Sequence, residues 1–124
     1  MNSKWVIDTY AWIEYFRASE EGRKAKPYIE SEGAITPAIV IAELKRKLLK
    51  EVDEGNETIE NMKKELEFVR ATTEIANMDY DIADKAAEIS MELKRRGAGL
   101  ADAIILATAQ KYNATVVTGD KHFK

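Results

Sequence analysis

Short apolar runs alternate along the chain with longer segments whose apolar residues recur every three or four positions. The short runs predict strands at 4–8, 34–36, 73–78 and 114–118. The longer segments predict helices at 9–16, 23–31, 37–50, 59–69, 81–96 and 100–109. Strands that alternate with helices in this way indicate an α/β domain with a mostly parallel sheet.

The third and fourth predicted helices are expected to form a hairpin. Thr36 and Pro37 are typical of a helix start, with an N-cap hydroxyl followed by proline at the first helical position. A polar turn at 53–56 then leads into a second amphipathic helix. The apolar faces are expected at these positions: Ile41, Leu44 and Leu48, then Ile59, Met62, Leu66 and Val69.

The segment 100–109 is apolar on every face except at Asp102 and Thr108, which is typical of a helix packed inside a domain. Asp102 lies in its first turn, where the free N–H groups and the helix dipole favour a negative charge. A buried carboxylate also needs a partner, a proton or a metal ion. Two helices separate the last two strands, so the helix at 81–96 must cross obliquely or double back.

The length of 124 residues suits one domain, 1–124. There is no cysteine, so the chain has neither disulfides nor a thiolate metal site. No apolar run is long enough to span a bilayer and no signal segment follows Met1, so a cytoplasmic location is expected. The net charge is −3, whereas a nucleic-acid-binding protein usually carries a positive net charge. Local clusters of basic residues could still bind nucleic acid.

Four carboxylates are expected at one edge of the sheet. Asp8 ends the first strand and Asp120 follows the last one, where ligands bind in parallel sheets. Glu43 belongs to the helix that leaves the second strand. The helix bearing Asp102 feeds into the last strand through a short linker at Asn113, so its start returns to the same edge. For Glu43 alone, an ion pair with Lys47 one helical turn later is an equally ordinary role.

Such a concentration of acids requires protons or a cation. Two carboxylates about 5 Å apart repel by roughly 3 kcal/mol at an effective dielectric constant of about 20. Oxygen ligands without cysteine favour Mg²⁺ or Mn²⁺ over Zn²⁺. Sites of this kind commonly bind a phosphate and orient a nucleophilic water. The single histidine, His122, lies beside Lys121 and Phe123 and is expected to be a bystander.

Four motifs together resemble the PIN domain, and the VapC-type toxin ribonucleases in particular. They are Val6-Ile7-Asp8-Thr9, the Glu43 helix after Thr36-Pro37, Leu100-Ala101-Asp102-Ala103 and Val116-Val117-Thr118-Gly119-Asp120. Each motif is weak alone, but their order and spacing extend the resemblance over essentially the whole chain. The family usually continues beyond the position of Lys124 into a final edge strand.

The resemblance implies a three-layer α/β/α fold with a central, mostly parallel sheet of four or five strands. It further implies Mg²⁺- or Mn²⁺-dependent endonucleolytic cleavage of RNA by the acidic quartet Asp8, Glu43, Asp102 and Asp120. Thr9 and Thr118 match polar positions beside that quartet. A homodimer held by a VapB-type antitoxin is the implied assembly, with an arginine of the antitoxin reaching the acids.

Two surfaces follow as candidates. RNA must be held by cations outside the acidic edge, and the candidates that flank it are Arg46, Lys47, Lys50, Lys121 and Lys124. The aromatic residues Trp12, Tyr15 and Phe16 offer apolar area either to the core or to a partner.

Other functions remain open on the sequence. A haloacid-dehalogenase-type phosphatase needs a second aspartate two residues after the first, where this chain has Tyr10. A phosphoacceptor signalling domain needs its aspartate after the third strand, which Asp79 only loosely allows. A PIN-like module that binds RNA or protein without turnover would carry the same residues.

Overall fold

The computed structural model describes residues 3–118 and contains a central sheet of four parallel strands. The spatial order is β3-β2-β1-β4, with bounds β1 Trp5–Ile7, β2 Ala34–Pro37, β3 Glu74–Ala76 and β4 Thr115–Val117. Val6 is in register with Ile35 on one side and with Val116 on the other. The predicted α/β class with a mostly parallel sheet is confirmed.

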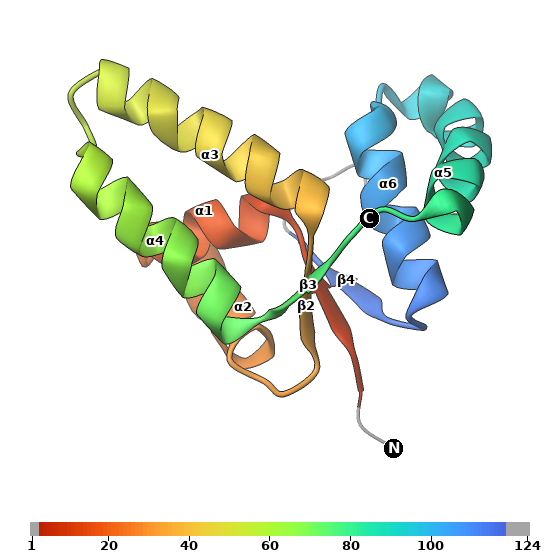
Figure 1. Ribbon diagram of the computed structural model, residues 1–124, viewed down its shortest axis with the longest axis horizontal. Coiled ribbons are helices and arrows are strands. Elements are labelled where there is room, and N and C mark those ends of the chain that lie inside the picture. Colours follow the sequence, from red (N-terminus) through yellow and green to blue (C-terminus); the bar gives the residue numbers. More distant parts are fainter. Residues whose placement is uncertain (1–2, 119–124) are drawn as a thin grey trace.

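Within residues 3–118, six α-helices flank the sheet, with α1–α4 on one side and α5 and α6 on the other (Figure 1). Their bounds are α1 Thr9–Arg17, α2 Glu20–Ile29, α3 Ala38–Asp53, α4 Ile59–Thr72, α5 Tyr80–Leu93 and α6 Leu100–Lys111. A short 3₁₀ turn, η1 (Lys94–Arg96), ends α5 before Gly97, whose φ of 76° closes the helix in the left-handed conformation. None of the helices within residues 3–118 has the length and apolarity needed to cross a membrane.

The helices α5 and α6 connect the two edges of the sheet, β3 and β4. They pack closely against each other and bury a second apolar cluster that includes Ile82, Ile89 and Ala103. The chain therefore doubles back at 97–99. Of the two paths expected for this helix, an oblique crossing or a reversal, the structure shows the reversal. The linker from α6 to β4 is three residues, Tyr112–Ala114, rather than Asn113 alone, and Asn113 adopts a left-handed φ of 52°.

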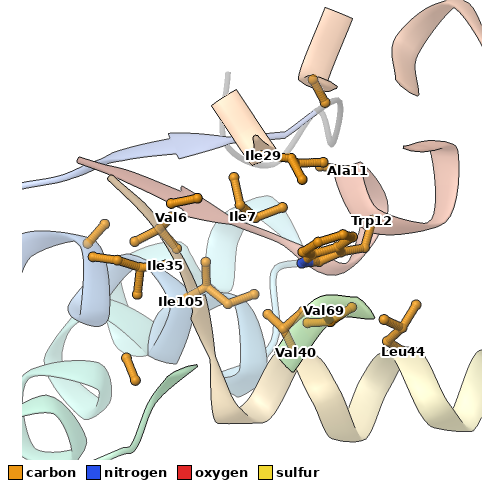
Figure 2. Close-up of a cluster of buried hydrophobic side chains, with 14 of the residues drawn as sticks. Val6, Ile7, Ala11, Trp12, Ile29, Ile35, Val40, Leu44, Val69 and Ile105 are labelled. Atoms are coloured by element: carbon orange, nitrogen blue, oxygen red, sulfur yellow. The ribbon is translucent and has the colours of Figure 1, made fainter. Parts of the chain in front are cut away.

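The main core lies between the sheet and the helices α1–α4 and α6, and Trp12 is its largest side chain (Figure 2). Trp12 is 0% exposed and packs among Ile7, Val40 and Leu44. Its indole N–H donates a 3.1 Å hydrogen bond to the Thr36 hydroxyl, so the one polar atom of the side chain is satisfied inside the core. Of the three aromatic residues considered for a partner surface, Trp12 is therefore unavailable.

The prediction that Thr36 caps the third helix is wrong. Thr36 and Pro37 end β2, and Pro37 is the N-cap residue of α3 with no side-chain capping bond. The Thr36 hydroxyl bonds instead with Thr73, the two oxygens being 2.6 Å apart, and Thr73 donates to the Val69 carbonyl. The Thr36 hydroxyl therefore joins β2 to Trp12 of α1 and to Thr73 at the end of α4, and it is not free to cap α3.

Three further helix predictions need correction. The second helix begins at Glu20 rather than Arg23 and continues through Pro27 to Ile29. In α3 the buried apolar residues are Val40, Leu44 and Leu48, so Val40 takes the place predicted for Ile41, which is only half-buried. In α4 the buried residues are Met62 and Val69, and Ile59 is 45% exposed because it opens the helix at the tip of the hairpin.

Candidate functional site

Asp8 lies directly after β1, and its carboxylate is fixed at the start of α1. The residue is 3% exposed, and its Oδ1 accepts a 2.8 Å hydrogen bond from the Ala11 amide in an N-cap arrangement. Its own amide donates to the Val117 carbonyl at 3.3 Å, which ties the end of β1 to β4. The helix N-terminus favours the negative charge that burial alone would penalise. The predicted place of Asp8 at the carboxyl end of the sheet is therefore confirmed.

Thr9 joins this position to Glu43. The Thr9 hydroxyl donates a 2.8 Å hydrogen bond to Oε1 of Glu43, which connects the first turn of α1 with the second turn of α3. Thr9 is buried and Glu43 is half-buried, so the bond holds the carboxylate partly out of water. Glu43 is thus held by the residue that directly follows Asp8, a residue that was predicted only to lie beside the acids.

Asp102 lies in the first turn of α6, as predicted, and is half-buried. Because α6 is followed by β4 after three residues, its N-terminal end returns to the carboxyl edge of the parallel sheet. The helix packs against both β1 and α3, the elements that lead to Asp8 and carry Glu43. Gly99, the N-cap residue of α6, has no side chain that could accept a hydrogen bond from the first turn. Asp102 is the acidic residue of that turn, where the helix dipole favours a negative charge.

Part of the predicted site lies outside the described residues, namely Asp120, Lys121, His122 and Lys124. Thr118 follows β4 directly and is half-buried. Among residues 3–118, no three acidic or histidine side chains form a group that could hold a metal ion. The described part of the acidic edge therefore consists of Asp8 and Glu43, linked through Thr9, and of Asp102 on the helix beside them.

The basic candidates that the structure describes lie on the exposed face of α3. Arg46, Lys47 and Lys50 are all solvent-exposed. Arg46 and Lys50 border a shallow apolar hollow with Lys45, Ile41 and Leu49. Glu43 forms its described hydrogen bond with Thr9, and no ion pair between Glu43 and Lys47 is present in the described part of the chain.

Sequence reasoning missed a second carboxyl pair, Glu57 and Glu65, at the tip of the α3–α4 hairpin. Burial and the neighbouring Glu57 carboxylate raise the pKa of Glu65 to about 8. The two residues are eight positions apart, in the loop before α4 and in its second turn. Neither charge nor spacing distinguishes them from the other glutamates of a strongly charged helix, so no sequence signal could have found them.

The family comparison agrees with this fold. The PIN domain family model matches residues 5–124, so the chain belongs to the PIN domain family. A comparison with curated proteins finds no match.

Solved structures with the same fold include toxin–antitoxin proteins. A toxin–antitoxin complex from Klebsiella pneumoniae is 26% identical, with a TM-score of 0.72 over 97% of this chain and 90% of that chain. DNA-bound VapBC from Salmonella typhimurium is 22% identical, with a TM-score of 0.76 over 98% and 91%. VapC20 from Mycobacterium tuberculosis, a sarcin–ricin loop cleaving toxin, is 14% identical, with a TM-score of 0.77 over 97% and 92%. At identities this low, the last two show the fold alone.

Removing the hydroxyl of Thr9 tests the link between the two acids. We expect Thr9→Val to lower the free energy of unfolding by about 1–2 kcal/mol, because a charged, half-buried acceptor loses its donor. Thr9→Ser should retain the bond and most of the stability. Urea unfolding measures both. The control is Thr115→Val, at an exposed threonine of β4, with an expected change within about 0.5 kcal/mol. A Thr9→Val variant as stable as the control would show that the bond contributes nothing.

Proposed function

We propose that this protein is a metal-dependent endoribonuclease that cleaves RNA phosphodiester bonds, the toxin of a toxin–antitoxin pair. The observation that carries the proposal is the acidic edge of a PIN domain, where Asp8 is fixed by a helix N-terminus and Thr9 connects it to Glu43. Asp102 reaches the same edge from α6, and Asp120 follows β4 in the sequence. The similarity to toxin–antitoxin structures adds support.

The proposed metal is Mg²⁺ or Mn²⁺, held by Asp8, Asp102 and Asp120, with Glu43 binding directly or through water. The donor set fits these ions because it consists of carboxylate oxygens only. Such an ion supplies Lewis-acid chemistry, which activates a water and stabilises charge on the phosphate.

Side chains of the protein itself have the other roles in the proposed reaction. Asp8 and Asp102 lie at helix N-termini, where the helix dipole favours a negative charge, and a carboxylate there is suited to bind a cation or to accept a proton from water. Thr9 orients Glu43 by donating to one of its oxygens, which limits the directions in which the carboxylate can act. Water would attack phosphorus and pass a proton to a carboxylate. The bond from phosphorus to the leaving ribose oxygen would break, and that oxygen would take up a proton from water or from the protonated carboxyl.

Replacing Asp8 tests this function. Asn is as good an N-cap as Asp, so Asp8→Asn should remain folded while losing the charge. We expect cleavage of defined RNAs in MgCl₂ or MnCl₂ to fall by about 100-fold or more, the range typical for loss of a group that moves a proton or holds the reacting centre. Asp102→Asn should behave alike and should also weaken Mn²⁺ binding measured by calorimetry.

The control for these variants is Asp53→Asn, at the exposed end of α3, with circular dichroism to verify folding. Full cleavage by Asp8→Asn, or cleavage undiminished in EDTA, would contradict the proposal. RNA binding without cleavage by the wild type in any metal would identify a silent binding module instead.

The RNA is proposed to lie along α3, where Arg46, Lys47 and Lys50 are exposed beyond the acidic edge. Lys121 and Lys124 remain candidates by their place in the sequence after Asp120. Cations that contact phosphates release counterions, so each contact makes binding more sensitive to salt.

Charge reversal at Arg46 and Lys47 together should weaken RNA binding and reduce its salt dependence. Because two phosphate-binding cations are removed, the slope of log affinity against log salt should become shallower by about 1.4 for a single strand. Fluorescence anisotropy over a series of KCl concentrations measures it. The matched control reverses Lys63 and Lys64, both exposed on α4. Equal losses of affinity in the two double variants would contradict a specific RNA path along α3.

The proposed partners are a second copy of the chain and a VapB-type antitoxin protein. Large apolar side chains are exposed on α5, where Tyr80 is 82% and Met91 is 70% exposed. Leu100 at the start of α6 adds to this surface, which suits contact with the same surface of another copy. An antitoxin arginine at the acidic edge would inhibit by occupying the carboxylates.

Light scattering after size-exclusion chromatography tests the homodimer. At micromolar concentration we expect twice the chain mass of 14.0 kDa. Met91→Glu should shift the protein toward the monomer, because a charge would be desolvated in the contact. Glu92→Gln, at the exposed neighbouring position, serves as the control. A wild-type chain that is strictly monomeric would rule out the dimer at that concentration.

A further inference from the structure

Two runs of three consecutive cations occur in this chain, whose net charge is −3, and the sequence contains no other run of that length. The first occupies 45–47 on α3, and the second is the 3₁₀ turn η1, Lys94–Arg96, which follows α5. All the side chains of both runs are solvent-exposed. We call the second run the basic turn.

The basic turn lies close to the start of α6, the helix that carries Asp102. The chain passes from Arg96 to Leu100, the first residue of α6, in four steps, which span at most about 14 Å. The flexible carbon stems of lysine and arginine extend the reach of their charges further. The basic turn therefore flanks the acidic edge on the side of α6.

The run at 45–47 has the same relation to the other acid, Glu43. Arg46 and Lys47 follow Glu43 by three and four positions, which is one helical turn of α3. The helix α3 and the pair α5–α6 lie on opposite sides of the sheet (Figure 1). The acidic edge therefore lies between two basic segments, one from each side of the sheet.

The charges of the basic turn are not neutralised within residues 3–118. None of its three side chains forms an ion pair there, and neither does Glu92, the nearest acidic residue along the chain. Glu88 of α5 is paired instead with Lys85, at 3.4 Å. The basic turn thus presents three positive charges to solvent.

The helix ends on either side of the basic turn do not account for three cations. The C-terminus of α5 favours positive charge, but this effect fades within one helical turn. The N-terminus of α6 follows at once and disfavours positive charge for the same reason. Gly97 already closes the turn, because its N–H donates a 3.1 Å hydrogen bond to the Lys94 carbonyl. The excess of positive charge is therefore suited to an anion from outside the chain.

We infer that the basic turn binds the phosphate backbone of the RNA on the α6 side of the acidic edge, while Arg46 and Lys47 bind it on the α3 side. One RNA strand crosses the edge, and the phosphodiester to be cleaved lies over the acids between the two basic segments. Arginine suits this contact because its planar guanidinium can bond two phosphate oxygens at once. The inference rests on the proposed ribonuclease function for the identity of the ligand, and it extends the RNA path beyond α3.

The test measures binding of fluorescein-labelled dodecauridylate by anisotropy in EDTA, where no metal supports turnover. The variant combines Lys94→Gln, Arg95→Gln and Arg96→Gln. Because a 3₁₀ turn has three residues per turn, these side chains point in different directions, and one or two of them can contact one strand. We expect the affinity in about 0.1 M KCl to fall about 5-fold for each lost contact, hence about 5- to 25-fold. The slope of log affinity against log salt should become shallower by about 0.7–1.4.

A matched control removes three exposed cations elsewhere, through Arg23→Gln and Lys26→Gln on α2 and Lys64→Gln on α4. These residues form no ion pair within the described part of the chain, so both triple variants lose the same charge without leaving an acid unpaired. We expect the control to bind RNA within about twofold of the wild type.

Two further measurements protect the comparison from other effects. Circular dichroism verifies that both triple variants are folded. Light scattering verifies an unchanged oligomeric state, because Met91 and Leu100 on either side of the basic turn belong to the surface proposed for a second copy. Titration of the wild type should give no more than one RNA strand per chain, as a single path across the edge requires.

Three results would overturn the inference: equal losses of affinity in the two triple variants, two RNA strands per wild-type chain of which the basic-turn variant loses one, or no RNA binding by the wild type in EDTA at low salt. Cleavage in MgCl₂ distinguishes this inference from the proposed function. The basic-turn variant should cleave with a raised KM and an unchanged kcat. A wild type that cleaves, with the same KM in both variants, would overturn the inference alone. Binding through the basic turn without any cleavage by the wild type would overturn only the ribonuclease proposal.

Discussion

A buried carboxylate at the end of the central strand β1 is the constraint on which the site depends. Asp8 cannot be taken out of water without compensation, and the N-terminus of α1 supplies it through the Ala11 amide. The same turn places Trp12 in the core, where it contacts the strand and the helix α3. One local arrangement therefore fixes the charge, the direction of α1 and the centre of the core. Thr9 extends it to Glu43, so that the position of a second acid follows from the same turn.

The molecule separates two kinds of acidic site. At the acidic edge, Asp8 and Asp102 lie at helix starts, where the helix dipole favours a negative charge. At the tip of the α3–α4 hairpin, burial and the hydrogen bond with Glu57 instead raise the pKa of Glu65 to about 8. The first arrangement is the one that we propose for the hydrolysis of a phosphodiester. Both are built on the α1–α3 contact, the first at the start of these helices and the second near their ends.

Much of the fold could be predicted because it depends on local patterns. The alternation of strands and helices predicted the parallel sheet. The position of Asp8 directly after an apolar run predicted that it lies at the carboxyl edge of that sheet. The role of Thr36 could not be predicted, because its partners Trp12 and Thr73 are 24 and 37 residues away. A Thr-Pro pair before a helix has the same local pattern whether the hydroxyl caps the helix or enters the core. The Glu57–Glu65 pair could not be predicted for a similar reason, since its properties arise from burial against α1 rather than from composition.

The central proposal is that Asp8, Asp102 and Asp120 bind one divalent cation, with Glu43 binding it directly or through water. Anomalous diffraction from crystals grown with MnCl₂, recorded at the manganese edge, tests this most directly. We expect one strong peak within ligand distance, about 2.0–2.3 Å, of carboxylate oxygens of Asp8 and Asp102. The peak should be absent from Asp8→Asn crystals grown in the same way. A manganese peak elsewhere, or none at this edge at saturating MnCl₂, would contradict the account.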